Sequence, residues 1–157
     1  MFELLPGTGV VLPHNAGVLR FGMSERAAQW AVATLADVRE TWVCQAGWAF
    51  TACYEGLELL AYGDVIDRLS RTEYDVDGLA AVHLFRYGAG PSIPSVPSAV
   101  PVVLRDVDLF GYPAVEVLDA LGPDPHPTVK LRPALDRAPA GYLREVGLLA
   151  QAVVWGG

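Results

Sequence analysis

Acidic side chains gather in one stretch of the sequence, which contains Asp64, Asp67, Glu73, Asp75 and Asp77. Closely spaced carboxylates can bind a metal cation or a basic protein. A calcium-binding loop needs regularly spaced oxygen ligands that end in a bidentate carboxylate, and this stretch lacks that pattern. We interpret it as a solvated loop. As the functional alternative, we predict that Asp64, Asp67, Asp75 and Asp77 contact a basic partner protein.

Aromatic side chains form a second candidate surface. Trp48, Phe50, Ala52 and Tyr54 are spaced by two, so they share one face of a strand. Core packing is the first explanation of such a face. The second is an exposed binding surface, because Trp and Tyr are favoured at the centres of protein interfaces. On this second explanation, Trp48 and Tyr54 join the predicted partner-binding residues.

The three histidines, His14, His83 and His126, lie far apart in the sequence, and none belongs to a zinc-binding or metalloprotease motif. We therefore predict no metal site. A site assembled by the fold from distant residues, such as Asp64, His83, Asp106 and His126, remains an open alternative.

Motifs of the common enzyme classes are absent from the sequence. Residues 6–9, Pro-Gly-Thr-Gly, lack the ending of a phosphate-binding loop, and no serine lies in a GxSxG sequence. Cys44 and Cys53 lie in apolar segments, where a buried and inert thiol is expected. We predict no catalytic residue and no cofactor.

Composition excludes several classes of partner. The chain has 157 residues, 52% of them hydrophobic, and a formal net charge of −7. Its few basic residues are scattered rather than clustered, so nucleic acid is a poor partner. No apolar run reaches the roughly 18 residues that cross a bilayer, and no membrane association is expected. The first residues do not resemble a signal peptide and cysteines are few, so we expect a cytoplasmic protein.

The elements that must position these residues alternate between short strands and helices. Residues 2–22 predict short strands joined by loops. Ser24 and Glu25 predict a helix start, and the apolar spacing carries the helix to about residue 35. Further strands are expected at about residues 40–45, 48–54, 57–62 and 79–86, whereas residues 65–71 suit a helical turn.

A proline-rich linker, residues 89–101, separates this part from a shorter one. There we expect a strand at 102–109, a helix at 114–121 that ends at Gly122, and strands near 129–131, 142–146 and 148–154. The prediction is a single α+β domain, residues 1–157, with two related halves at about 1–88 and 102–157. Each half is a short helix before a small antiparallel sheet.

Two segments carry a resemblance to known proteins. Residues 19–24, Leu-Arg-Phe-Gly-Met-Ser, followed by a short helix, resemble the helix start in the β-lactamase inhibitory protein and the SmpA-type lipoproteins. Residues 108–118 resemble a stretch of uncharacterised bacterial proteins, some from toxin-immunity loci. The resemblance implies a tandem-repeat fold that binds protein through an exposed sheet face, with no catalytic residues.

The leading hypothesis is therefore a non-enzymatic binding protein of immunity or inhibitor type, which meets its partner through the sheet face and the acidic stretch. A small enzyme or ligand-binding domain is the first alternative. A subunit of a homo-oligomer, which would bury the apolar excess between copies, is the second.

Overall fold

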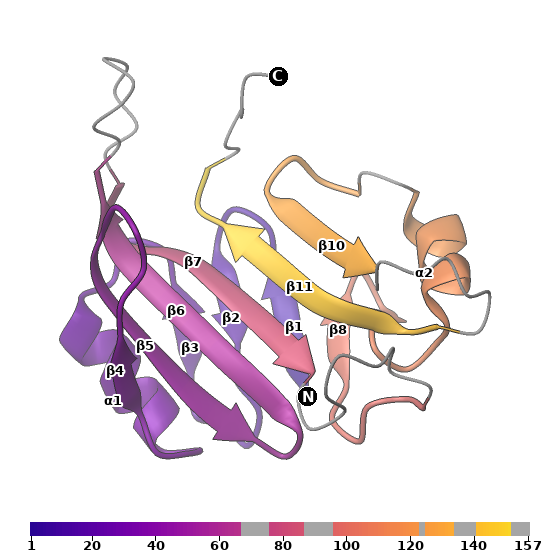
Figure 1. The fold of residues 1–157 in the computed structure, drawn as a ribbon, viewed down its shortest axis with the longest axis horizontal. Coiled ribbons are helices and arrows are strands. Elements are labelled where there is room, and N and C mark those ends of the chain that lie inside the picture. The colour runs from indigo at the N-terminus through magenta and orange to yellow at the C-terminus, as the bar shows by residue number, and fades with distance from the viewer. Residues whose placement is uncertain (67–75, 87–95, 123–124, 134–140, 152–157) are drawn as a thin grey trace.

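The computed structural model describes residues 1–66, 76–86, 96–122, 125–133 and 141–151, and these form two helices and two sheets (Figure 1). Sheet A has the strand order β3-β2-β1-β8-β9 and sheet B the order β10-β11-β7-β6-β5-β4. All neighbouring strands pair antiparallel except β1 and β8, which are parallel. The expected α+β class is confirmed.

The strands of sheet A are β1 (Phe2–Leu5), β2 (Gly9–Val11), β3 (Val18–Arg20), β8 (Val102–Leu104) and β9 (Val107–Asp108). The strands of sheet B are β4 (Arg39–Thr41), β5 (Ala46–Tyr54), β6 (Leu57–Val65), β7 (Val76–Arg86), β10 (Val129–Pro133) and β11 (Leu143–Leu149). The helices are α1 (Glu25–Ala33) and α2 (Ala114–Leu121).

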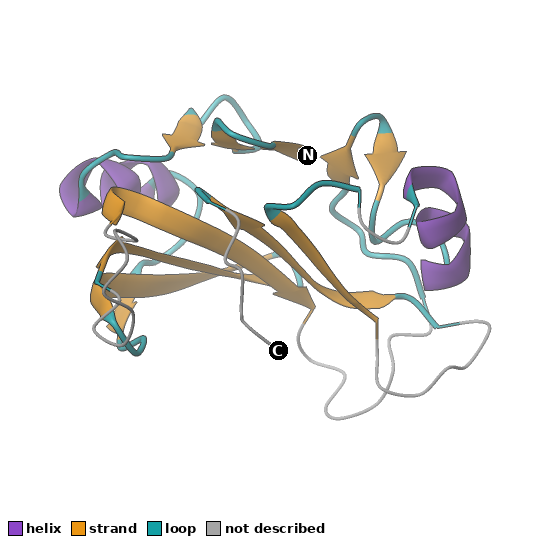
Figure 2. Ribbon diagram, turned by 90° about the horizontal axis from the view of Figure 1, so that it is seen from above, coloured by secondary structure: helices purple, strands orange, loops and turns teal. Residues whose placement is uncertain are grey.

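The core lies between the two sheets. Figure 2 shows the sheets as two layers, with α1 at one end and α2 at the other. Both layers direct alternate apolar side chains inward, as a sheet with one buried face requires. Fully buried members include Phe2, Leu19, Phe50, Leu84 and Leu148.

Helix α1 begins where the sequence predicts. The Ser24 hydroxyl accepts a hydrogen bond from the Ala27 amide at 3.2 Å, which satisfies one free donor of the first turn. Ala28 and Val32 are buried against the sheets. The helix ends at Ala33, slightly before the expected position.

Three predictions need correction. Residues 42–45 are not strand, since 42 and 43 have no regular structure and 44 and 45 form a turn, so β4 stops at Thr41. The segment 102–109 is a hairpin, because Arg105 and Asp106 form a two-residue turn with φ of 49° and 66°. The two strands expected after residue 141 are one strand, β11, which runs through Gly147.

The two parts of the chain share both sheets, because β1 pairs with β8 in sheet A and β7 pairs with β11 in sheet B. Most of the predicted linker, and most of the segment 65–71, lies outside the described residues. The repeat relation between the halves stays a prediction. No helix in the described part of the chain is long and apolar enough to cross a membrane.

Candidate functional site

The aromatic face of β5 points into the molecule. Trp48 is only 8% exposed, and its ring stacks on Phe50 with centroids 5.9 Å apart. Tyr54 is half-buried and meets Phe2 edge-on at 5.9 Å. The even positions of β5 therefore face sheet A. Core packing therefore explains the position of Trp48. The sequence could not show which face of β5 sheet A covers.

Of the predicted acidic residues, Asp64 and Asp77 lie in the described structure, whereas Asp67 and Asp75 lie outside it. Asp64 has a positive φ of 50° at an irregularity in the pairing of β6 with β7. Its carboxylate accepts a hydrogen bond from the Gly78 amide at 2.7 Å. Asp64 thus joins the two strands, while Asp77 is exposed beside this junction.

The outer face of sheet B, the face turned away from sheet A, holds a connected group of side chains, of which only His83 was named from the sequence as a candidate site residue. His83 lies at its centre. The His83 Nδ1 is 3.2 Å from a Glu145 carboxylate oxygen, and its Nε2 is 3.4 Å from the Tyr62 hydroxyl. The His83 ring also stacks on the rings of Tyr62 and Phe85, at 5.7 and 6.0 Å. We call Tyr62, His83, Phe85 and Glu145 the outer strip.

Strand register explains how these residues meet. Glu145 lies opposite Phe85, and Gly147 lies opposite His83. A Cβ at position 147 would be 2.7 Å from the His83 Nδ1, so only glycine leaves the imidazole its observed place. His83 and Phe85 are spaced by two on a predicted strand, which was the available signal. The pairing of β7 with β11 was not predictable from local patterns.

The electrostatics of the outer strip shift the pKa values of Glu145 and Tyr62 in opposite directions. The hydrogen bond with His83 lowers the pKa of Glu145 and outweighs the opposing effect of burial, and Arg132, whose Nε is 3.7 Å away, lowers it further. Burial and, second, the Glu145 charge raise the pKa of Tyr62. An ionised carboxylate only accepts hydrogen bonds, so in the neutral ring Nδ1–H donates to Glu145 and Nε2 accepts from the Tyr62 hydroxyl.

Both ring nitrogens of His83 have a hydrogen-bond partner. A histidine oriented by a carboxylate can act as a general base when a substrate reaches its free nitrogen. Here the Tyr62 hydroxyl lies at that nitrogen, and the raised pKa of Tyr62 keeps the phenol protonated at neutral pH. The outer strip is a half-buried surface of three rings and one carboxylate.

The distant residues proposed as an assembled site do not come together. Asp64 bonds to Gly78, His83 to Tyr62 and Glu145, and the His126 ring to Thr128 at 2.8 Å. Across the described residues, no hydrogen bond or ion pair joins any two of Asp64, His83, Asp106 and His126.

The expectation for the cysteines was wrong. Cys44 and Cys53 are both free and exposed. Cys44 lies in the turn after β4, and Cys53 lies on the outer face of β5, opposite Glu58. Within the described ranges, no three side chains of His, Cys, Asp or Glu gather closely enough to hold a metal ion.

Comparison with known proteins adds no relative. No protein family, no curated protein and no solved structure matches this chain.

Proposed function

We propose that this chain is a non-enzymatic protein-binding module that meets a basic protein through the outer face of sheet B. The observation that carries the proposal is the outer strip. Its rings are held in place by hydrogen bonds and stacking before any partner arrives, so binding would cost little side-chain entropy. No described helix or strand covers this face (Figure 2).

The charge at one end of the strip supports a basic partner. Tyr62 is two residues from Asp64 on β6. The Asp64 carboxylate accepts a hydrogen bond from the Gly78 amide, and the residue before Gly78 is the exposed Asp77. The chain as a whole carries a net charge of −7. An aromatic centre beside an acidic border complements a basic surface with apolar residues at its centre.

The sequence resemblance extends this proposal. A partner that is an enzyme or a toxin would make the chain an inhibitor or immunity protein, built from two related halves. The free, exposed thiols of Cys44 and Cys53 support a reducing compartment, the cytoplasm, because exposed thiols persist there without oxidation.

A capture experiment with two matched variants tests the proposal. Phe85→Lys places a cation on the outer strip between Glu58 and Glu145, which lie opposite Phe85 on the neighbouring strands and can accept its charge. Trp30→Lys makes the same charge change on α1, where the Trp30 side chain is 73% exposed. Both proteins, and the wild type, are immobilised and exposed to lysate of the source organism at low and high salt.

We expect a stoichiometric protein that binds wild type and Trp30→Lys, is lost with Phe85→Lys, and dissociates as salt rises. Circular dichroism checks that Phe85→Lys is folded. A protein that binds all three equally would contradict the proposed surface, and binding that is insensitive to salt would contradict the basic partner.

Self-association is the second candidate, and one observation favours it. Trp30 and Trp42 are 73% and 79% exposed, which is unusual for such large apolar side chains. Light scattering of the wild type measures the mass directly. A dimer that becomes a monomer in Trp30→Lys or Trp42→Lys would support this candidate.

A further inference from the structure

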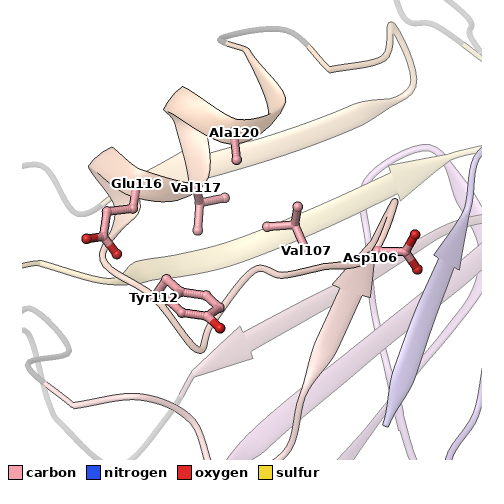
Figure 3. Close-up of a pocket in the computed structure, with 6 residues that line it drawn as sticks. All are labelled: Asp106, Val107, Tyr112, Glu116, Val117 and Ala120. Atoms are coloured by element: carbon pink, nitrogen blue, oxygen red, sulfur yellow. The ribbon is translucent and has the colours of Figure 1, made fainter.

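A hollow of about 260 Å³ lies between α2 and the β8–β9 turn, at the end of the molecule away from α1 (Figures 1 and 3). We call it the α2 pocket. Its lining residues are Asp106, Val107, Tyr112, Glu116, Val117 and Ala120. None of them belongs to the outer strip, so an inference from the pocket goes beyond the proposed function.

Two local structures build the pocket. Glu116, Val117 and Ala120 lie on one side of α2, since Ala120 is four positions from Glu116 and three from Val117, and residues at these spacings are neighbours on a helix. The β8–β9 turn brings Asp106 to the facing side with a left-handed φ of 66°. Val117 is buried and forms part of the floor, whereas Asp106, Tyr112 and Glu116 are exposed at the rim.

The positions of the polar groups indicate which kind of ligand fits the α2 pocket. Figure 3 shows the Glu116 and Asp106 carboxylates at opposite ends of the pocket, with Val107, Val117 and Ala120 between them and the Tyr112 ring to one side. The space between is largely apolar. A long aliphatic stem with a cationic head matches this pattern, because the stem contacts the apolar floor while the head reaches a carboxylate or the ring face.

Both carboxylates are available for such an occupant. In the part of the chain that the structure describes, no ion pair involves Asp106 or Glu116. Two anionic groups at the rim disfavour phosphate and carboxylate ligands, and the net charge of −7 attracts cations to the whole surface.

The size and shape of the pocket favour a side chain over a free metabolite. Sites for small molecules usually have about 300–1,000 Å³ and bury most of the ligand. The α2 pocket is smaller, with about 260 Å³, and is open on one side. A side chain that enters from a polypeptide leaves its own backbone outside and needs only such a hollow.

We infer that the α2 pocket receives the side chain of an arginine or lysine carried by a partner polypeptide. The stem packs on Val117 and Val107, and the cationic head pairs with Glu116 or Asp106. The exposed Tyr112 and Val115, which are 54% and 52% exposed, provide apolar contacts for the flanking residues of that polypeptide.

Titration with blocked peptides, followed by ¹⁵N–¹H NMR of the full chain, tests this inference. The probe is acetyl-Gly-Arg-Gly-amide, and the control replaces arginine with citrulline, which has nearly the same shape but no charge. We expect saturable shifts confined to residues 104–121 with the arginine peptide and roughly two- to five-fold weaker binding of the citrulline peptide. Equal binding of the two peptides, or shifts centred elsewhere, would overturn the inference.

Variants test which carboxylates take part. Asp106→Asn combined with Glu116→Gln should weaken the arginine peptide by roughly five-fold, since each exposed ion pair contributes a modest amount. Asn also tolerates the left-handed φ at position 106, so the turn is kept. Asp119→Asn removes an exposed carboxylate of α2 that does not line the pocket, and it should change nothing.

Two more measurements separate the alternatives. Agmatine carries the same cationic stem without a polypeptide, and tighter binding of agmatine than of the peptide would make the ligand a free organic cation and overturn the assignment. Phe85→Lys should leave peptide binding unchanged. An absence of peptide binding at the α2 pocket can therefore be distinguished from an absence of partner binding at the outer face of sheet B.

Discussion

The two faces of sheet B consist of the same strands but carry different kinds of side chain. On β6, Leu59 points inward and is 3% exposed, whereas its neighbour Leu60 points outward and is only partly buried. On β7, Leu84 is buried in the core, whereas His83 stacks between two rings and bonds to Glu145. The inner face requires apolar volume, while the outer face requires particular side chains.

This difference separates stability from recognition. Burial of apolar area stabilises the inner face in proportion to the area, and aliphatic residues of similar size could replace one another there. The polar groups of the outer strip contribute little net free energy, because water competes for their hydrogen bonds. The proposed function assigns their specific arrangement to binding.

The largest expected effect is a comparison of matched leucines on the two faces. Leu59→Ala should lower the free energy of unfolding by about 2–5 kcal/mol, because it opens a cavity in the core. Leu60→Ala should lower it by about 1 kcal/mol or less. Urea denaturation measures both. Equal losses would mean that the outer face is covered like the inner one, and the comparison would fail.

Next in size is Gly147→Ala. The added Cβ would press on the His83 ring, so the ring must move and its bond to Glu145 must weaken. We expect a loss of about 1–3 kcal/mol in the free energy of unfolding. The double variant with His83→Ala is the control, because removal of the ring should restore most of the loss. An equal loss in that background would show that position 147 is constrained by the backbone instead.

A smaller effect concerns pH. The pKa of Glu145 is lowered in the folded state, so its contribution to stability is present above the ordinary value of 4.5 and is lost as pH falls through the lowered value. Glu145→Gln should therefore be about 1 kcal/mol less stable than the wild type at pH 6, and the difference should shrink below pH 4.5. Thermal unfolding across this range measures it, and a difference that grows in acid would contradict the assigned contact.

The smallest effect is a stabilising one. Glu55 and Gly56 form the two-residue turn between β5 and β6, with φ of 45° and 86°. Asn accepts this left-handed conformation more readily than Glu. Glu55→Asn should raise the free energy of unfolding by roughly 0.5 kcal/mol. The turn also fixes the register of β5 on β6, which assigns each residue to a face, so unchanged NMR contacts between the paired residues Phe50 and Ala61 are the control.

The local elements were largely predictable, and the site was not. The helix at Ser24 and the strands 48–54, 57–62 and 79–86 follow from capping and from apolar spacing, which are local properties. The hairpin turn at Arg105 and Asp106 was missed because neither residue is the Gly or Asn that usually marks a left-handed turn.

The candidate site depends on long-range pairing, which short patterns do not encode. Trp48 was placed on the correct shared face, but only the packing of sheet A on sheet B decides that this face is the core. The outer strip needs β11 beside β7, and residues 83 and 145 are far apart in the sequence. The cysteines were expected to be buried because apolar neighbours suggested it, yet Cys44 lies in a turn and Cys53 on the outward side.

The sharing of both sheets between distant parts of the chain has a consequence for synthesis. The Phe2 amide donates a hydrogen bond to the Pro101 carbonyl, and β7 pairs with a strand that ends at Leu149. Sheet A cannot be completed until Asp108 has left the ribosome, and sheet B not until Leu149 has. Such a high contact order places folding in the slow range, on the order of milliseconds to seconds. Until then, β1 and β7 would be unpaired edges that other chains could join, so the nascent protein is the state most exposed to aggregation.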